Sequence, residues 1–265
     1  MDLSIVIVNY KSREKTQRCL ESIYHADLDH FSFETILVDN ASGENLDDLK
    51  GKYKNLRVLY SSRNLGMGGG NNLGIKEAAG EFILILNPDT IVRPDAIKIL
   101  HEYIKDRPDV YVVGPKLLNP DGSLQYSCSH FPKIYTPILR RTFLGDYFKT
   151  SRDGFMMTDF DHDEIAPVDW IMGSCLLVRH AGWEGFDERF FMYFEDVDLC
   201  KRVKIIGKKV IYDPEAVVVH DHNRQSARYP WYIAPWKDGL AREHIKSWIK
   251  YFWKWKVLKN KIKTR

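Results

Sequence analysis

The chain lacks apolar runs long enough to cross a membrane and the cysteine spacing of a metal site. No apolar stretch reaches the roughly 18 residues of a membrane-spanning helix. The four cysteines form no Cys-x-x-Cys pair, which argues against a zinc site and favours buried thiols in a reducing compartment. No basic segment precedes the strand-like run that starts near Met1, so we expect no signal peptide and a cytoplasmic protein.

Positive and negative charges nearly balance over the whole chain, but positive charge is concentrated at its C-terminal end. The net charge of the 265 residues is +3, yet residues 237–265 hold ten lysines and arginines against two acids, which gives them +8 and leaves −5 for the remainder. This pattern indicates a domain at residues 1–236, a basic tail at residues 237–265, and an anionic partner for the tail alone. Because no nucleic-acid-binding module is visible, we expect no nucleic acid partner.

Strand-like and helix-like segments alternate along the chain. Strands are expected at residues 3–8, 33–38, 56–60, 81–86, 110–114, 168–178 and 209–219, and helices at residues 13–25, 44–54, 71–79, 94–105 and 195–206. The alternation predicts an α/β fold with a Rossmann-like, mostly parallel sheet and helices on both faces. Residues 118–167 are rich in turn signals and are expected to be irregular.

Polar side chains follow several of the expected strands, at Asn9, Asp39, Arg63 and Asp89. In parallel sheets the carboxyl ends of the strands share one edge, where ligands bind. A second signal is the hexad 194–199, in which Glu195 and Asp196 open a helix. A carboxylate pair at that place suits general-base chemistry, although acids in a first turn can also serve only the helix dipole.

A glycine-rich segment at residues 66–70 follows the third strand. It is no dinucleotide fingerprint, because that fingerprint must follow the first strand, which disfavours a dehydrogenase. We expect these glycines to form a loop that lets backbone approach a ligand closely. Asn71 and Asn72 then hold sugar or phosphate oxygens, or cap the helix that follows.

With these motifs the chain resembles family 2 glycosyltransferases of the GT-A fold, and most of all their rhamnosyltransferase-like branch. The resemblance covers roughly residues 3–225. The matching segments are Ser4–Tyr10, Leu37–Ser42, Asn64–Gly66, Asn71–Gly74, Leu86–Asp89, Gly173–Cys175, Phe186–Glu188, Phe194–Leu199 and the surroundings of His220. It implies an inverting transfer from a nucleotide-diphosphate donor, with dTDP-L-rhamnose ahead of a UDP-sugar, to a polysaccharide or lipid-linked glycan.

The resemblance also implies roles for single residues. Asp39 contacts the N3–H of uracil or thymine, Asp196 takes the proton of the acceptor hydroxyl, and Glu195 orients the acceptor or Asp196. Asp89 stands where many relatives carry Asp-x-Asp and is expected to bind Mg²⁺ or Mn²⁺, with Asn87 in place of the first acid. His220 is a candidate further metal ligand, favoured over its neighbour His222.

The remaining expected contacts fall into two groups. Donor contacts are expected from Asn9, Tyr10, Arg63, Asn64, Gly66, Asn71, Asn72 and Arg224, with the two arginines near phosphate. Trp170, Gly173 and Tyr193 are expected to line the sugar or acceptor site, or, for the two aromatic residues, to pack in the core.

The tail predicts an amphipathic helix. Arg242, Lys246, Lys250 and Lys254 form a charged stripe, and the opposite side holds Ile245, Trp248, Ile249, Phe252 and Trp255. Aromatic and basic residues in this arrangement are typical of helices that lie on a membrane surface. We therefore favour peripheral contact with the inner face of the cell membrane over packing on the domain or a dimer contact.

Two other functions are compatible with parts of the sequence. A nucleotidyltransferase would need a basic glycine-rich signature soon after the first strand, where residues 9–12 stand instead. A catalytically silent nucleotide-sugar or glycan-binding module would not need Asp89 together with the Glu195-Asp196 pair. Both are therefore less favoured than a glycosyltransferase.

Overall fold

The computed structural model describes residues 1–142, 144–221, 230 and 232–263. Its first half contains β1 (Leu3–Asn9), α1 (Arg13–Tyr24), β2 (Phe33–Asp39), α2 (Asp47–Lys50), β3 (Leu56–Tyr60), α3 (Gly66–Ile75), β4 (Phe82–Leu86), β5 (Thr90–Val92) and α4 (Ala96–Lys105). The second half contains β6 (Val110–Leu118), β7 (Leu124–Gln125), β8 (Cys128–Ser129), α5 (Thr136–Arg141), α6 (Leu144–Tyr147), α7 (Lys149–Met156), β9 (Ala166–Pro167), β10 (Trp170–Ile171), β11 (Cys175–Arg179), α8 (Glu195–Ile205), β12 (Lys209–His220), α9 (Ala234–Lys237) and α10 (Gly239–Lys263).

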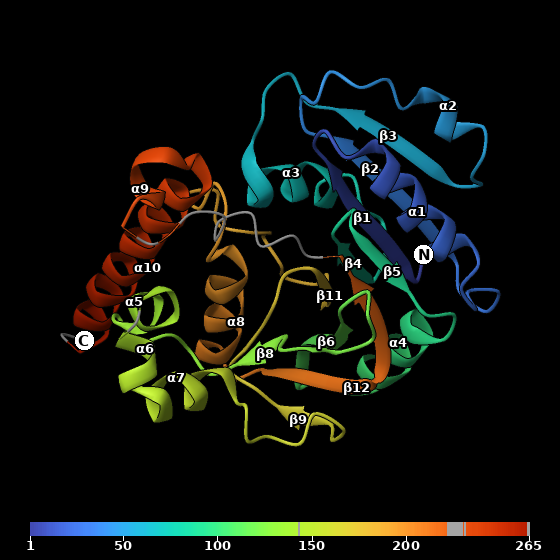
Figure 1. Cartoon of the computed structure of the whole chain (residues 1–265). Helices are drawn as coiled ribbons and strands as arrows, with labels where there is room; N and C mark the ends of the chain where they lie inside the picture. Colours follow the sequence, from blue (N-terminus) through green and yellow to red (C-terminus); the bar gives the residue numbers. More distant parts are fainter. Residues whose placement is uncertain (143, 222–229, 231, 264–265) are drawn as a thin grey trace.

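One mixed sheet forms the centre, with the strands in the order β3-β2-β1-β4-β11-β6-β12-β5 (Figure 1). The strands from β3 to β4 are mutually parallel, and β12 runs parallel to β6. Strand β11 runs antiparallel to both β4 and β6, and β5 runs antiparallel to β12. The expected α/β class with a mostly parallel sheet is confirmed, and the reversed direction of β11 and β5 is the feature that the sequence pattern did not reveal.

Helices cover both faces of the sheet, because the central strands are apolar on both sides. All seven residues of β1 are buried, and successive side chains point to opposite faces. Leu3, Ile5 and Ile7 belong to one core with α1 and α4, whereas Val6 and Val8 belong to a second core that includes residues of α3 and α8. The sheet is therefore held between two apolar layers, as expected for buried parallel strands.

The glycine-rich segment is a helix and not the expected loop, since α3 begins at Gly66. A Cβ at Gly70 would lie 2.9 Å from Cγ1 of Val8, and one at Gly74 would lie 2.5 Å from Cγ1 of Val6. The glycines thus let α3 lie directly against β1. This packing outweighs the cost of roughly 1 kcal/mol that each glycine brings to a helix interior.

Other expectations for local structure were wrong in part. Only Asp47–Lys50 is helical within the expected helix at residues 44–54, although Leu46 and Leu49 are fully buried. The segment 118–167 is not irregular, because it contains the three short helices α5, α6 and α7. None of the helices in the described ranges has both the length and the apolar character needed to cross a bilayer.

The C-terminal helix exists as predicted, but it packs on the domain. Tyr251 of α10 is 3 % exposed in a cluster with Phe190, Phe194 and Val197, next to α8 (Figure 1). Three residues of the expected membrane face, Trp248, Phe252 and Trp255, pack against this cluster. Helix α10 therefore has an inner face docked on this cluster and an outer face directed away from it.

Candidate active site

The register of the sheet brings the predicted polar positions to one edge. Asn9 and Asp39 are direct partners at the ends of β1 and β2. Because β11 is antiparallel, its first residue Cys175 pairs with Leu86, the last residue of β4. The backbone N–H of Asn87 consequently donates to the carbonyl oxygen of Ser174 at 2.9 Å. Segments from both halves of the chain therefore meet at the carboxyl ends of the parallel strands.

Asp39 forms part of a cleft of about 540 Å³ at this edge. The cleft is lined by Asp39, Ala41, Gly43, Glu44, Asn45, Asp47, Tyr60 and Ser61. The carboxylate of Asp39 accepts hydrogen bonds from the Asn9 side chain at 3.0 Å, from the Ser42 backbone N–H at 3.1 Å and from the Ser42 hydroxyl. These three donors hold the Asp39 carboxylate, which is a hydrogen-bond acceptor, in a fixed place in the cleft wall.

Asn9 itself lies beneath this cleft and is fully buried. Its amide nitrogen donates to Asp39 and to Glu44 (2.8 Å), and its oxygen accepts from Thr16 (2.9 Å) and from Ser12 (3.0 Å). Asn9 thus orients Asp39 through contacts within the protein. Tyr10 and Arg63, in contrast, are exposed at the ends of β1 and β3.

The start of α3 forms the next wall of the site. Gly66 has φ +74° and lies so close to the loop before α8 that a Cβ would collide with the carbonyl oxygen of Phe191. The side-chain oxygen of Asn64 accepts the Gly66 N–H at 2.9 Å. Asn72 is occupied by the backbone N–H and C=O of Phe186, at 2.7 and 2.9 Å. Asn71 keeps a buried side-chain oxygen that no partner in the described part of the chain satisfies.

Asp89 and His220 lie together, as the sequence predicted from separate motifs. Asp89 Oδ1 is 3.3 Å from His220 Nε2, and His220 Nδ1 is 2.7 Å from Gln125 Oε1. Lys15 adds positive charge, because its Nζ is 4.0 Å from Asp89 Oδ2 and 3.0 Å from Asp221 Oδ2. Burial raises the pKa of Asp89, but His220 and Lys15 outweigh it and hold that pKa below its usual value.

The hydrogen bonding of His220 fits a cation at this place. The amide nitrogen of Gln125 donates to Asn119 Oδ1 at 2.8 Å, which leaves Gln125 Oε1 to accept from His220 Nδ1. His220 Nε2 is thereby directed at the Asp89 carboxylate 3.3 Å away, and an imidazole nitrogen beside a carboxylate oxygen is a pair that can hold a metal ion. The described residues contain no cluster of three His, Cys, Asp or Glu side chains, so this is a two-ligand set.

The Glu195-Asp196 pair opens α8 and is buried, at 9 % and 8 % exposure. Asp196 accepts the backbone N–H of Gly173 on Oδ2 and that of Val197 on Oδ1, both at 2.8 Å. Burial and the neighbouring Asp196 charge raise the pKa of Glu195 to about 8, and burial also raises the pKa of Asp196. Oε2 of Glu195 is buried without a protein partner in the described ranges.

The backbone before this pair is strained. Tyr193 and Phe194 have φ values of 67° and 69°, a left-handed conformation that residues with a Cβ rarely adopt. Such strain persists where the surrounding contacts fix the conformation, and it is common at functional sites. The direction in which Glu195 and Asp196 leave the loop therefore depends on the packing around these two aromatic residues.

The candidate substrate-binding residues occupy different surroundings. Gly173 donates to Asp196, so it positions the carboxylate. The Trp170 ring stacks on Phe155 with centroids 6.2 Å apart and belongs to the edge of the core. The Tyr193 ring lies 5.0 Å from the His244 ring of α10. Arg224 and His222 lie outside the described residues.

Sequence reasoning missed Lys15, Gln125 and the contacts of α10. Lys15 lies in the first turn of the helix that follows β1, a position from which it reaches the ligand edge, and this spacing was the available signal. Gln125 has no such signal, because it lies on the short strand β7 at a distance of 95 residues from His220.

Comparison with known proteins agrees with this geometry. The family model described as "Glycosyl transferase family 2" matches residues 4–165. The N-acetylglucosaminyl-diphospho-decaprenol L-rhamnosyltransferase of Mycobacterium tuberculosis is 31% identical over 264 residues, which are 93% of this chain and 83% of that protein. The rhamnosyltransferase WbbL of Escherichia coli is 28% identical over 262 residues, which are 92% of this chain and 94% of that protein.

Solved structures show the same fold at low identity. The Staphylococcus aureus protein TarS, residues 1–349, in complex with UDP has a TM-score of 0.58 at 18% identity, and the match covers 83% of this chain and 60% of that one. A mannosyltransferase of Pyrobaculum calidifontis in complex with GDP-Man and Mn²⁺ has a TM-score of 0.60 at 16% identity, covering 94% of this chain and 64% of that one. The chain therefore belongs to glycosyl transferase family 2 and is a glycosyltransferase with a GT-A-like fold.

Proposed function

We propose that this enzyme transfers L-rhamnose from dTDP-L-rhamnose to a lipid-linked glycan with inversion at the anomeric carbon. The two rhamnosyltransferases of about 30% identity support the sugar, and one of them is named for a diphospho-decaprenol substrate. The observation that carries the proposal is the meeting of three elements at one sheet edge, namely the Asp39 cleft, the Asp89–His220 pair and the buried Glu195-Asp196 pair.

The Asp39 cleft suits a thymine or uracil base. An ionised carboxylate only accepts hydrogen bonds, so its partner on the base must be an N–H group. Thymine and uracil carry such a group at N3, whereas cytosine has an acceptor there. Tyr60, half exposed in the same cleft, offers a flat surface beside the base. These features support a thymidine or uridine nucleotide over a cytidine nucleotide.

Asp89 and His220 would hold Mg²⁺ or Mn²⁺, with diphosphate oxygens and water completing the shell. When bound, such an ion neutralises the negative charge that develops on the leaving diphosphate. Lys15 adds a fixed positive charge at the same place. Exposed Arg63 is available to a phosphate oxygen from the end of β3.

Transfer in this site is a single displacement. The acceptor hydroxyl oxygen bonds to the anomeric carbon, the bond from that carbon to the diphosphate oxygen breaks, and the nucleoside diphosphate leaves with the electron pair. Asp196 takes the hydroxyl proton as the new bond forms. Since the attack comes from the face opposite the leaving group, the anomeric configuration inverts.

The buried acid pair can hold one negative charge where the reaction needs it. Two adjacent carboxylates in a dry site do not both ionise, and the proton stays on the less stabilised one. Asp196 has two backbone N–H donors and Glu195 Oε2 has none, so the charge belongs on Asp196 and the proton on Glu195. Glu195 then presents a neutral acid group toward the acceptor.

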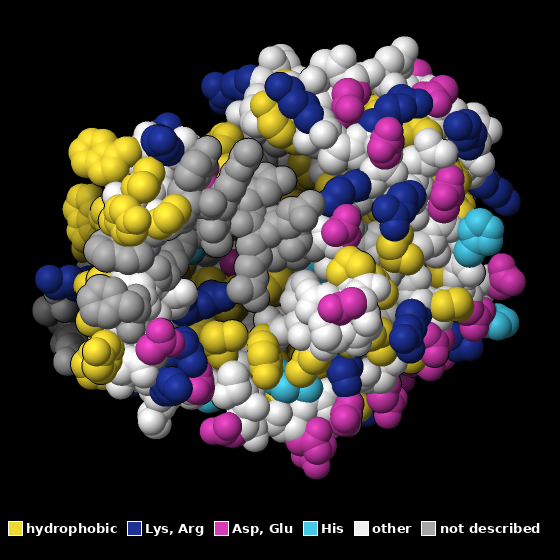
Figure 2. Space-filling view, in the orientation of Figure 1, with side chains coloured by type: hydrophobic (Ala, Val, Ile, Leu, Met, Phe, Trp, Pro, Cys, Tyr) yellow, Lys and Arg dark blue, Asp and Glu magenta, His cyan; other side chains and the backbone are white. Residues whose placement is uncertain are grey.

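The outer face of α9 and α10 supports peripheral contact with a membrane that carries the lipid-linked acceptor. Trp236, Ile249 and Trp253 are 84 %, 58 % and 70 % exposed, and Lys246 and Lys256 are also exposed. Figure 2 shows hydrophobic side chains gathered where α9 and α10 reach the surface. Exposed tryptophans beside lysines suit the interface of an anionic bilayer.

The first experiment measures thermal stabilisation by nucleotide sugars. Wild type and Asp89→Ala are each heated with dTDP-L-rhamnose, UDP-glucose or GDP-mannose, in Mn²⁺ and in EDTA. We expect a metal-dependent rise in Tm with dTDP-L-rhamnose that Asp89→Ala loses. A rise with UDP-glucose alone would refute rhamnose as the sugar, and a rise that survives in EDTA would refute the metal site.

The second experiment measures transfer to a prenyl-diphosphate-linked N-acetylglucosamine by mass spectrometry. Asp196→Asn should lower kcat by a factor of about 10² to 10⁴, the usual contribution of a general base, and keep the Tm rise with donor. An Asp196→Asn enzyme with wild-type kcat would refute its role.

A third experiment measures binding to vesicles of anionic lipid. Binding should weaken in Trp253→Ser, and unchanged binding would refute the membrane face.

A further inference from the structure

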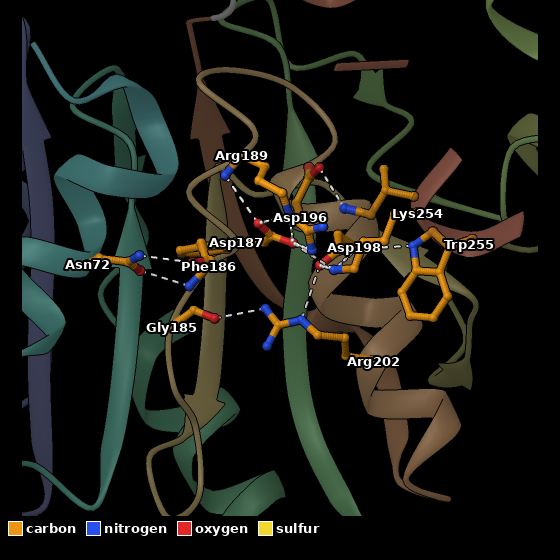
Figure 3. A network of polar contacts seen from close by, with 11 residues as sticks. Asn72, Gly185, Phe186, Asp187, Arg189, Asp196, Asp198, Arg202, Lys254 and Trp255 are labelled. Atoms are coloured by element: carbon orange, nitrogen blue, oxygen red, sulfur yellow. Dashed lines mark hydrogen bonds and ion pairs between the residues drawn. The ribbon is translucent and has the colours of Figure 1, made fainter. Parts of the chain in front are cut away.

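The loop that leads into the acid pair, residues 185–194, is held from two sides. On one side it is fixed to α3, because Asn72 binds the backbone of Phe186 (Figure 3). In addition, the Met67 N–H donates to the Phe191 carbonyl at 2.7 Å. The α3 contacts link this loop to the donor half of the sheet.

On the other side the loop is fixed to α10. Lys254 Nζ lies 2.8 Å from Asp187 Oδ2 and 2.6 and 2.7 Å from the two carboxylate oxygens of Asp198 (Figure 3). Lys250 Nζ donates to the Arg189 carbonyl at 2.8 Å, and the Ser247 hydroxyl donates to the Met192 carbonyl at 2.8 Å. One face of α10 thus meets the loop at three successive points and the first turn of α8 at Asp198.

Lys254 is a buried charge in this contact, unlike a lysine of a solvated stripe. Its side chain is 9 % exposed, and that of Asp198 is fully buried. Asp198 also accepts from Trp255 Nε1 and Arg202 Nε, each at 3.1 Å. Without Lys254, Asp187 keeps its ion pair with Arg189 and Asp198 keeps its ion pair with Arg202, but the cation that joins the loop to the first turn of α8 is lost.

The strained residues lie between the two anchors and the acid pair. Tyr193 and Phe194 are both left-handed, and each such residue costs on the order of 1 to 2 kcal/mol. The Phe194 ring contacts His244 and Tyr251 of α10, with centroids 5.5 and 5.3 Å apart. Helix α10 therefore supplies part of the packing that keeps this conformation in place.

We propose that α10, through Lys254, is a positioning device for the base: by binding Asp187 and Asp198 it fixes the loop and the first turn of α8, and thereby the direction of the Asp196 carboxylate. This inference rests on the proposed role of Asp196. Lys254 should therefore affect the rate of the chemical step. It should not affect donor binding, which depends on the Asp39 cleft.

The test compares Lys254→Met, Lys254→Arg and Lys105→Met. The Lys105→Met control removes an exposed helix lysine at the end of α4. We expect kcat for transfer to fall about 10- to 100-fold in Lys254→Met, as for a misplacement of roughly 1 Å, with the KM for donor and the Tm rise with donor unchanged. Lys254→Arg should recover most of kcat, and Lys105→Met should match wild type.

A folded Lys254→Met enzyme with kcat within twofold of wild type would overturn the proposal. A rise in the KM for donor equal to the loss of kcat/KM would also overturn it, since that indicates general loosening of the site. If Lys254→Met does not fold, Ser247→Ala replaces it. Loss of this one hydrogen bond should lower kcat about three- to tenfold, and an unchanged kcat in Ser247→Ala would contradict the proposal.

Hydrogen exchange separates this proposal from the proposed function. In Lys254→Met the amides of peptides spanning residues 185–198 should exchange at least tenfold faster than in wild type, while Lys105→Met leaves them unchanged. If wild type transfers no sugar from any donor, the proposed function fails and the exchange rates alone decide whether α10 holds the loop. Equal exchange in all variants would refute that coupling.

Discussion

Replacing Glu195 by glutamine should make the donor-free protein more stable, by an amount that grows with pH. Burial and the Asp196 charge raise the pKa of this carboxyl from 4.5 to about 8. The folded state therefore binds a proton between these pH values that the unfolded state has released. The contribution of this proton to the free energy of unfolding is fully present below pH 4.5 and is lost as the pH rises toward 8.

The magnitude follows from the same shift. Each pH unit between the two pKa values costs the wild type about 1.4 kcal/mol of unfolding free energy. From pH 6 to pH 8 the wild type should lose about 2 kcal/mol relative to Glu195→Gln, because glutamine does not titrate. Glutamine has the shape of the neutral acid, so the substitution leaves the packing of α8 in place.

The assay is urea unfolding of wild type and Glu195→Gln at pH 6, 7 and 8, with Glu14→Gln as the control for loss of an exposed carboxyl. A stability difference that stays constant over this pH range would refute the assignment of the proton to Glu195. Transfer gives a second measurement: Glu195→Gln should lose less than about tenfold in kcat, far less than Asp196→Asn, if the working form of Glu195 is neutral.

Two further predictions concern packing. Gly66→Ala should destabilise the protein by at least about 2 kcal/mol more than Gly43→Ala, because both glycines have positive φ but only a Cβ at Gly66 meets the Phe191 carbonyl, and equal urea midpoints would contradict this. All four cysteines are buried, and burial raises the pKa of Cys128 and Cys200 to about 12. Iodoacetamide should therefore leave the native protein unmodified at pH 8 and alkylate it in urea, and rapid native alkylation, read by mass spectrometry, would contradict the burial.

The sequence predicted the sheet edge well, because strand ends carry their own signal. Apolar β-branched runs stop at Asn9 and at Asp39, and in the structure these residues are register partners. The start of α8 at Glu195 was equally visible, since two acids precede an apolar-periodic segment. Such features depend on residues that are close in sequence.

Other parts depended on contacts that are distant in sequence. The glycines of α3 have low helix propensity, and only their fit against Val6 and Val8 explains why the segment is helical. The reversed direction of β11 depends on its two neighbours in the sheet. Lys254 belongs to a four-residue charge stripe that resembles a solvated face, and its burial depends on acids 56 and 67 residues away.

The β4–β11 pairing sets a rule for building chimeric enzymes from this chain. Strands β1 to β4 carry the Asp39 cleft, and β11 begins beside Gly173, which holds Asp196. The two halves of the sheet meet at one antiparallel ladder, from Cys175 opposite Leu86 to Arg179 opposite Phe82. A donor-binding half taken from a relative must therefore bring a β4 that keeps this five-residue register, because a shift by one residue would turn the buried side chains of β4 to the wrong face and move Gly173 away from its place at the ligand edge.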